Sequence, residues 1–454
     1  MKSKSSLIIS LVILALLAGG LPALASSTTA VPQLPWDFDT VVNDTNTGRI
    51  SVGFDAYTRA PMVVYYDWDA QRLTQAVYRG PGFAGNCGPS NTWYCVIVGT
   101  DLQVGVYNAV GYFSNPYADN YRKTGFFLYD PSHNSLEFVT RYANDSSTGQ
   151  TQTTVINLTD YCLGQECVIS SAISMVYDAG GHAHAVAVID SAGDDNLVYF
   201  YDRGTPGGNC DNYGGSDYWD LSVVIAENNE ARNPSITIVP PNSPRIAYYR
   251  PPDSSLHYAY PSDINANCDT NGLWRCITID NSAATGYYPS IAYGDALHIA
   301  YFNDTDMHLY LAKYVGSGGN CGFDLTGNKW QCEAIDFIGG TSAQRGISLV
   351  MDGSEPVIAY MDANDGDQTE VKLAQRVQRV GLTYGNCGPG DIFQTWDCQT
   401  LDQGPYSLGA EVEMFITPRG GLFLGYLEDN YDAYEVHVLA ARQYYKLSLP
   451  LIRK

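Results

Sequence analysis

The stretch that decides the fold runs from Pro289 to Asp336 and contains four short apolar runs: Pro289-Ser-Ile-Ala-Tyr293, His298-Ile-Ala-Tyr-Phe302, His308-Leu-Tyr-Leu-Ala312 and Lys329-Trp-Gln-Cys-Glu-Ala-Ile-Asp336. Polar and turn-forming residues separate the runs, and apolar residues alternate along them. Four such runs indicate a four-stranded antiparallel sheet. Versions of this unit recur at a period of about 55 to 66 residues, which is typical of the blades of a β-propeller.

The number of blades follows from the copies of the second strand. This strand is an apolar run that ends in Tyr and a polar residue. Its copies span residues 62–67, 245–250, 298–303, 357–362 and 423–428, with looser copies at 126–130 and 185–190. The third strand begins at Leu73, Leu136, Leu197, Leu256, Leu309, Val371 and Val436. Both sets have seven members, so the sequence predicts an all-β, seven-bladed propeller.

The fourth strand predicts how the ring closes. A tryptophan marks this strand in five units, at Trp93, Trp219, Trp274, Trp330 and Trp396. The second unit has residues 151–156 instead, and the seventh unit ends without such a strand. The same pattern occurs at residues 35–42, before the first unit. We therefore predict that this N-terminal strand pairs with the last blade, which leaves no exposed sheet edge. The alternative places Trp36 in a leader that packs loosely on the surface.

The first 25 residues have the features of a secretory signal peptide. Lys2 and Lys4 precede an apolar run over residues 7–17, and Ala23-Leu-Ala25 supplies a small-residue cleavage site. The apolar run is short for a membrane span. We expect a signal peptide at 1–25, a linker at 26–33, the propeller at 34–445 and a tail at 446–454. This organisation predicts a secreted or extracellular protein, with cell-surface association as an alternative.

Eight of the 11 cysteines belong to four copies of one device. One Cys follows Asn in a turn after the third strand, and the other lies two residues beyond the blade's Trp. The pairs are Cys87 with Cys95, Cys268 with Cys276, Cys321 with Cys332, and Cys387 with Cys398. We predict disulfides rather than zinc sites, because each pair lies in a separate blade without neighbouring His ligands.

Three cysteines fall outside this device. Cys162 and Cys167 lie close together in an insertion between the second and third units, whereas Cys210 has Leu221 where its partner is expected. The simplest assignment pairs Cys162 with Cys167 and leaves Cys210 free. A bridge from Cys210 to Cys162 or Cys167 remains the alternative, because a free thiol is unusual in a secreted protein.

The charge balance limits the partners. The formal net charge is −23 and the isoelectric point is about 4.4. Binding to nucleic acid or to an anionic membrane surface needs clustered Lys and Arg, so both are disfavoured. No later segment of the sequence reaches the length of a transmembrane helix.

Acidic residues gather in the turns between the second and third strands. Because strand direction alternates, these turns share one face of the ring with the connections between blades, and we predict a ligand-binding rim there. Its candidate residues are Asp67, Asp69, Asp130, Asp190, Asp194, Asp304, Asp306, Asp429 and Asp432.

Residues 362–370 are the best candidate for a metal site. Asp362, Asp365 and Asp367 supply carboxylates around a Gly, and Ca²⁺ prefers six to eight oxygen ligands. Asp, Asn and Gly also form turns readily, so a simple turn is the alternative. Calcium is therefore the only cofactor that the sequence suggests.

The units resemble the degenerate repeats of secreted bacterial seven-bladed β-propellers, through Ile-Ala-Tyr, Leu-x-x-Ala and Trp-x-Cys. The resemblance covers nearly the whole mature chain but selects no functional family. The sequence lacks the Ser-x-Asp-x-Gly-x-Thr-Trp boxes of sialidases, and the His-Glu-x-x-His and Gly-x-Ser-x-Gly motifs.

Two classes of function therefore remain. The favoured one is a noncatalytic recognition or scaffold protein that binds a glycan or a surface protein through its acidic, Tyr-rich face, because Tyr rings stack on the apolar faces of sugars. The alternative is a carbohydrate-active hydrolase or lyase that uses carboxylates near the central channel.

Overall fold

The computed structural model divides the chain into two units, residues 1–33 and 34–454, and the described residues belong to the second. The described ranges are 36–45, 47–80, 84–89, 91–98, 107–115, 122–142, 150–191, 194–225, 230–268, 272–282, 284–339, 346–364, 368–377, 384–388, 394–404, 408–418, 420–429 and 434–441. The predicted signal peptide, linker and tail lie outside them. Within these ranges, no helix is long and apolar enough to cross a membrane.

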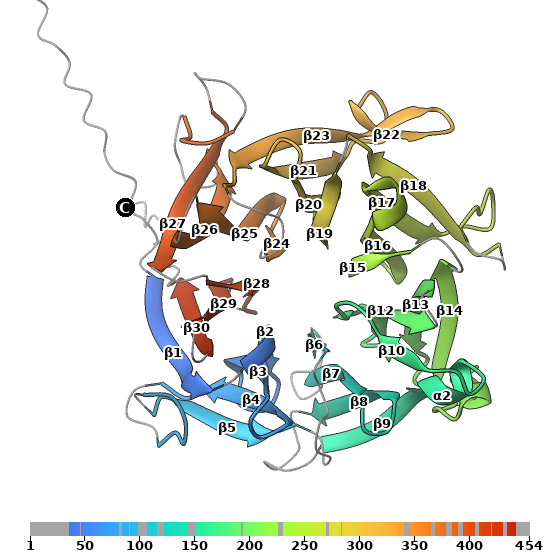
Figure 1. Cartoon of the computed structure of the whole chain (residues 1–454), viewed down its shortest axis with the longest axis vertical. Coiled ribbons are helices and arrows are strands. Elements are labelled where there is room, and N and C mark those ends of the chain that lie inside the picture. Colours follow the sequence, from blue (N-terminus) through green and yellow to red (C-terminus); the bar gives the residue numbers. More distant parts are fainter. Residues whose placement is uncertain are drawn as a thin grey trace, which may run out of the picture. The chain divides into compact units, whose positions relative to one another are not determined.

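The second unit is a ring of seven antiparallel sheets, as predicted (Figure 1). Blades 1 to 3 contain β2 (Thr47–Asp55), β3 (Ala60–Asp67), β4 (Arg72–Tyr78) and β5 (Trp93–Ile97); β6 (Asn108–Ser114), β7 (Arg122–Asp130), β8 (Ser135–Tyr142) and β9 (Gln150–Asn157); and β11 (Ser174–Tyr177), β12 (Ala183–Ser191), β13 (Asp194–Asp202) and β14 (Trp219–Ile225).

Blades 4 to 7 follow the same order from the centre outward. They contain β15 (Arg232–Val239), β16 (Ser243–Arg250), β17 (Ser255–Pro261) and β18 (Trp274–Asp280); β19 (Thr285–Tyr293), β20 (Leu297–Asn303), β21 (His308–Tyr314) and β23 (Gly327–Phe337); β24 (Ile347–Asp352), β25 (Glu355–Asn364), β26 (Gln368–Arg376) and β27 (Trp396–Gly404); and β28 (Leu408–Ile416), β29 (Leu422–Asp429), β30 (Tyr434–Ala441) and β1 (Trp36–Thr45).

The N-terminal strand closes the ring, as predicted. β1 pairs antiparallel with β30, with Trp36 opposite Ala441 and Phe38 opposite Leu439. The first described strand is therefore the outer strand of the last blade. This pairing removes the sheet edge that blade 7 would otherwise expose.

Two sheets carry a fifth strand that the repeat does not predict. In blade 3, the insertion forms the short helix α2 (Leu158–Tyr161) and the strand β10 (Cys167–Ile169), which pairs with β12. In blade 5, β22 (Cys321–Asp324) pairs with β23 at the perimeter. Two 3-10 turns, η1 (Cys210–Tyr213) and η2 (Pro251–Asp253), complete the described elements.

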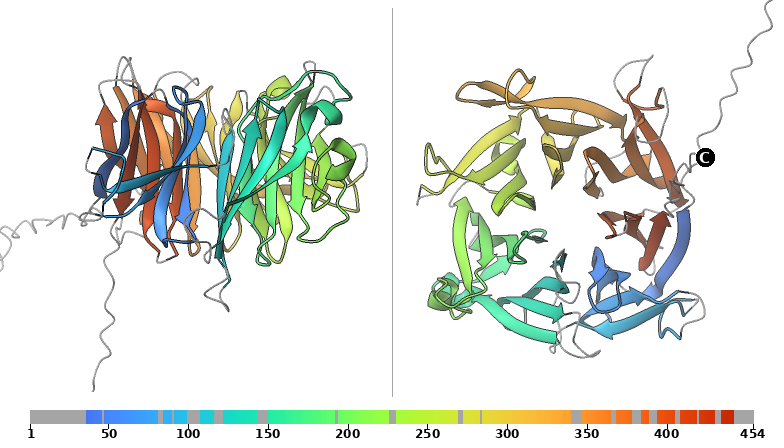
Figure 2. Two further views of the ribbon diagram at one scale, coloured as in Figure 1. Left: turned by 90° about the horizontal axis from the view of Figure 1, so that it is seen from below. Right: turned by 180° about the vertical axis from the view of Figure 1, so that it is seen from behind.

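The core lies between adjacent blades, which follow one another around the ring (Figure 2). The apolar residues of strands two and three are mostly buried, and in five blades the tryptophan of the outer strand packs with them in the same clusters. The five tryptophans are all buried: Trp93, Trp219, Trp274, Trp330 and Trp396.

An asparagine clamp explains the repeated Asn-Cys pair. The side-chain oxygen of Asn320 accepts the backbone N–H of Cys332 at 2.7 Å, and its amide donates to the carbonyl of the same residue at 2.9 Å. The preceding Gly319 is required because a Cβ there would lie 1.9 Å from the Trp330 carbonyl oxygen. Equivalent clamps join Asn86 to Cys95, Asn209 to Leu221, Asn267 to Cys276, and Asn386 to Cys398.

The structure contains the four predicted repeat disulfides and the predicted bridge between Cys162 and Cys167. Cys210 is free and buried in the same apolar cluster as that bridge. The alternative in which Cys210 takes part in a bridge is therefore wrong for this structure.

The Tyr of the Ile-Ala-Tyr repeat joins neighbouring blades. Tyr301 donates its hydroxyl to Asp280 of the preceding blade at 2.7 Å, and Tyr360 does the same to Asp336 at 2.6 Å. Tyr426 makes the equivalent bond to Asp402. We call the contact between two adjacent blades a seam. One Tyr–Asp hydrogen bond joins the blades in each of three consecutive seams, from blade 4 to blade 7.

Candidate functional site

A cavity of about 540 Å³ lies at the perimeter, between blades 4 and 5. The outer strand β18 of blade 4 forms one wall. The β22–β23 hairpin of blade 5 forms the other. This is where blade 5 departs from the four-stranded pattern, so the additional strand builds the site.

The hairpin presents two large apolar side chains. Phe323 and Leu325 both line the cavity, and each is 70 % exposed. Phe323 lies opposite Asn328 in the register, and Gly327 turns the chain with a positive φ of 114°. The bridge from Cys321 to Cys332 ties this hairpin to the blade.

An ion pair crosses the cavity from one blade to the other. Arg275 of β18 pairs with Asp324 of β22 and also donates to the carbonyl oxygen of Asn265 at 2.9 Å. Burial alone would raise the pKa of Asp324. The Leu325 N–H and the Arg275 guanidinium outweigh it and hold this pKa below its ordinary value. Asp324 is therefore ionised near neutral pH and keeps Arg275 oriented.

The other end of the cavity is fixed by Asp280. Its carboxylate accepts the Tyr301 hydroxyl and the backbone N–H of Ser282, the latter at 3.0 Å. The side chains of Asn281 and Asn328, in contrast, make no hydrogen bond to any residue in the described ranges. The cavity therefore combines fixed charged groups with free amides and an exposed aromatic ring. Polar groups of this kind beside an aromatic face bind ligands that have both hydroxyl groups and apolar surface.

The residues of the predicted acidic rim lie elsewhere, in the turns between second and third strands. Several of their carboxylates accept hydrogen bonds from residues of the same turn. Asp67 accepts the N–H of Ala70 at 2.9 Å, and Asp130 is buried and bonded to Ser132 and His133. Asp306 accepts the Tyr310 hydroxyl. Three others lie in or beside such turns: Asp69, Asp190 and Asp304. The structure does not describe the side chains of Asp194 and Asp429, and Asp432 lies outside the described residues.

The predicted calcium ligands are only partly placed. Asp362 is buried, where it pairs with Lys372 at 3.0 Å and accepts the Gly339 N–H at 3.0 Å. A lysine so close competes with any metal ion for this carboxylate. Asp365 and Asp367 lie outside the described residues. A calcium site in this turn therefore stays a prediction.

Among the described residues, one group of potential metal ligands is close enough to share an ion: Asp336, Cys387 and Cys398. Both sulfurs, however, belong to the disulfide between these cysteines. A disulfide sulfur is not the thiolate that binds a metal. This group therefore offers no metal site in the oxidised protein.

The sequence prediction missed the cavity, although a signal was present. The cysteines of blades 5 and 6 are 11 residues apart, whereas those of blades 1 and 4 are 8 apart. The longer loop of blade 5 contains Phe323 and Leu325 between turn-forming residues. Exposed apolar residues in a lengthened loop could have suggested a binding hairpin.

No protein-family model matches the chain, and neither does any curated protein. Solved structures share the propeller arrangement at low identity. A mutant of AofleA from Arthrobotrys oligospora has 9% identity and a TM-score of 0.42, covering 82% of this chain and 91% of its own. The six-bladed fungal lectin of Aleuria aurantia has 11% sequence identity and a TM-score of 0.41, and the match covers 80% of this chain and 96% of the lectin. The polysaccharide lyase Uly1 has 10% sequence identity and a TM-score of 0.41, and the match covers 89% of each chain.

Proposed function

We propose that this protein is an extracellular, noncatalytic recognition propeller that binds a glycan in the cavity between blades 4 and 5. The observation that carries the proposal is the exposed Phe323 ring beside the Arg275–Asp324 ion pair. An aromatic ring stacks on the C–H face of a sugar, while charged and amide groups bond its hydroxyls.

The charge of the protein narrows the class of glycan. With a net charge of −23, the surface repels anionic polysaccharides over distances up to the Debye length. Within the cavity, Arg275 is already neutralised by Asp324. A neutral glycan therefore fits this site better than an acidic one.

The test is a binding measurement with a panel of neutral and acidic polysaccharides, followed by titration of the best ligand. We expect Phe323→Ala to weaken binding about tenfold, since an aromatic contact contributes roughly 0.5–1.5 kcal/mol beyond its burial. Phe337→Ala is the matched control, because Phe337 is also exposed but does not line the cavity. Equal affinities for wild type and Phe323→Ala would exclude the cavity as the site.

A second candidate function is a carbohydrate-active hydrolase that works in the central channel. Glu411 and Glu413 lie on the innermost strand β28, and burial raises the pKa of Glu413 to about 8. A protonated carboxyl near neutral pH is what a general acid requires. It ranks second because both carboxylates already accept backbone N–H groups of β2, from Ile50 at 2.7 Å and Val52 at 3.1 Å.

The two candidates differ in product formation. Incubation of the protein with the same polysaccharide panel, followed by an assay for new reducing ends or unsaturated sugars, tests for catalysis directly. New products that disappear in Glu413→Gln and persist in Phe323→Ala would favour the hydrolase. Binding without products supports the recognition protein.

A further inference from the structure

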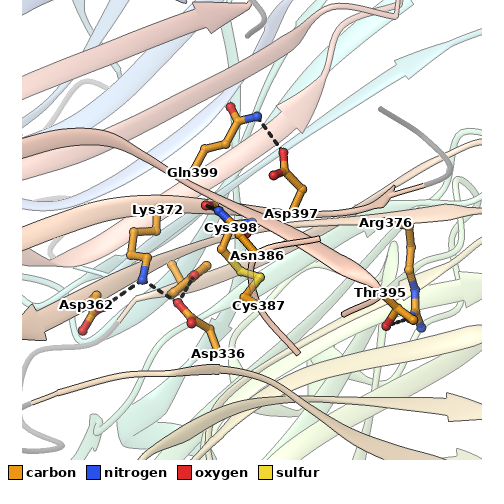
Figure 3. Close-up of a disulfide and its surroundings, with 11 residues drawn as sticks. Asp336, Asp362, Lys372, Arg376, Asn386, Cys387, Thr395, Asp397, Cys398 and Gln399 are labelled. Carbon is orange, nitrogen blue, oxygen red and sulfur yellow. Dashed lines mark hydrogen bonds and ion pairs between the residues drawn. A yellow bond between two sulfur atoms is a disulfide. The ribbon is translucent and has the colours of Figure 1, made fainter. Parts of the chain in front are cut away.

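Blades 5 and 6 meet at a lysine held between two aspartates (Figure 3). Lys372 of β26 donates hydrogen bonds to Asp336 of β23 and to Asp362 of β25. The side chains of Lys372, Asp336 and Asp362 are 14%, 15% and 3% exposed. The amine and the two carboxylates are therefore in contact and largely withdrawn from water.

The carboxylate of Asp336 is held in place by hydrogen bonds. The Tyr360 hydroxyl donates to the same Asp336 oxygen that accepts from Lys372. A carboxylate oxygen of Asp336 lies within 4.8 Å of both sulfurs of the Cys387–Cys398 disulfide. Figure 3 shows the disulfide beside Asp336, with Lys372 pointing toward both aspartates. The carboxyl carbon of Asp336 is thus placed next to an amine in a site that admits little water.

The neighbouring seams show that this lysine is not needed to close a seam. The residue opposite the seam tyrosine is Tyr310 in blade 5 and His437 in blade 7, whereas it is Lys372 in blade 6. All three seams keep the Tyr–Asp hydrogen bond. Blade 6 has therefore added an amine to a contact that the other two seams complete without one.

We propose that Lys372 and Asp336 form an amide cross-link between blades 5 and 6, with Asp362 carrying the proton. The Lys372 nitrogen bonds to the carboxyl carbon of Asp336, and one carbon–oxygen bond of that carboxyl breaks. Two of the three protons on the ammonium nitrogen pass, by way of Asp362, to the departing oxygen, which leaves as water, and the third stays on the amide nitrogen. The ion pair becomes one amide and one water molecule, with no oxidant, reductant or other co-reactant.

Physical chemistry favours the condensation at this place more than in solution. Two groups fixed in contact react with an effective molarity of about 10⁵–10⁸ M in well-oriented cases. The site also excludes water, which would drive the reverse hydrolysis. A buried ion pair carries a desolvation cost, and the neutral amide removes it. Tyr360 donates to the oxygen on which negative charge develops, as an oxyanion donor does.

The protonation state of Lys372 decides whether its nitrogen can attack the carboxyl carbon. Burial lowers the pKa of Lys372, but the hydrogen bonds and charges of Asp336 and Asp362 outweigh it and raise this pKa. The ammonium must therefore pass a proton to a carboxylate before it can attack. Asp362 also contacts Lys372 and is the most buried of the three groups. Its carboxylate accepts a hydrogen bond from the Lys372 nitrogen at 3.0 Å, so it is placed to take up that proton.

The test is the intact mass of the full mature protein, measured under denaturing conditions after complete reduction of the disulfides, with the N-terminus determined independently. We expect a mass below that of the sequence by one water molecule. A proteolytic digest should contain a branched peptide that joins the segment around Asp336 to the segment around Lys372. A full sequence mass, with both segments recovered as linear peptides, overturns the proposal.

Variants separate the role of each residue. Lys372→Arg keeps the positive charge but cannot form this amide, so it should have the full sequence mass. Asp362→Asn should leave most of the protein unlinked, because the proton carrier is lost. Lys313→Arg is the control, since Lys313 pairs with Asp295 on the exposed surface and its replacement should leave the water deficit intact. A deficit that persists in Lys372→Arg would assign the cross-link to other residues and overturn the proposal.

Discussion

The seam between blades 4 and 5 and the seam between blades 5 and 6 begin from the same contact and end with different chemistry. Each has a Tyr of the second strand bonded to an Asp at the end of the preceding outer strand. In the first seam, the link between blades lies at the perimeter, where Arg275 and Asp324 border a cavity. In the second, Lys372 sits inside the seam, between the carboxylates of Asp336 and Asp362.

The difference shows how copies of a degenerate repeat can acquire different chemistry at equivalent positions. The Tyr–Asp bond satisfies the packing requirement in both seams, so the neighbouring positions are free to vary. One seam uses this freedom to add a hairpin with an exposed ring. The other adds an amine. Substitution at a few positions therefore separates a surface suited to a ligand from a contact suited to a permanent lock.

The largest expected effect is on stability, when the cation of each seam is removed. Lys372→Met leaves two buried carboxylates without their partner, which should lower the free energy of unfolding by about 3–5 kcal/mol. Arg275→Met affects a pair nearer the perimeter and should cost about 1.5–3 kcal/mol. Denaturant unfolding of both variants measures the difference. Equal losses would mean that the two seams bury their charges alike.

The disulfides beside the two seams should differ in their effect on binding. Each closes a loop with a sequence separation of 11, so replacing either Cys pair by Ser should cost a similar 2–4 kcal/mol. Cys321→Ser with Cys332→Ser also releases the β22 hairpin and should weaken glycan binding. Cys387→Ser with Cys398→Ser should leave the affinity unchanged. Loss of affinity in both double variants would show that ring stability, and not the hairpin, controls binding.

The smallest expected effect is an opposite response to pH. Burial raises the pKa of Asp362 above its ordinary value of 3.8, so its contribution to stability is present below that pH and is lost as pH rises through the folded pKa. The pKa of Asp324 is lowered, because the Leu325 N–H and Arg275 outweigh burial. Its contribution is present above pH 3.8 and is lost as pH falls through the folded pKa.

Melting temperatures against pH test these signs. Asp362→Asn should flatten the part of the curve above pH 3.8, and Asp324→Asn should flatten the part below it. Asp263→Asn, in an exposed loop, controls for the change in net charge. Changes of the same sign in both variants would contradict the assigned causes.

The ring and its closure could be predicted from sequence because they depend on local patterns. Alternating apolar residues predict strands, and the displaced strand at residues 35–42 predicts its partner from what blade 7 lacks. The Cys pairs were also predictable, since each pair lies within one hairpin. Periodicity of this kind is visible without knowing how the blades sit against each other.

The seams could not be predicted in the same way. The bond from Tyr360 to Asp336 joins side chains of different blades, and the twist and spacing of the sheets decide whether they meet. Asp362 looked like part of an acidic turn, yet it pairs with Lys372, which lies opposite Tyr360 on the next strand. The cavity depends on β22, a strand that the repeat itself does not contain.

The asparagine clamp has a consequence for how the protein responds to a reducing medium. In blade 3, where Cys210 is free, the side-chain amide of Asn209 bonds to Leu221 of the outer strand without a disulfide beside it. Every bridged blade has the same two hydrogen bonds beneath its sulfur atoms. Thiols that open the bridges lengthen the loops of the unfolded chain and so shift the folding equilibrium. The amides remain in place and keep each Asn loop attached to its outer strand, whereas the β22 hairpin at the proposed glycan site loses its covalent tie to blade 5.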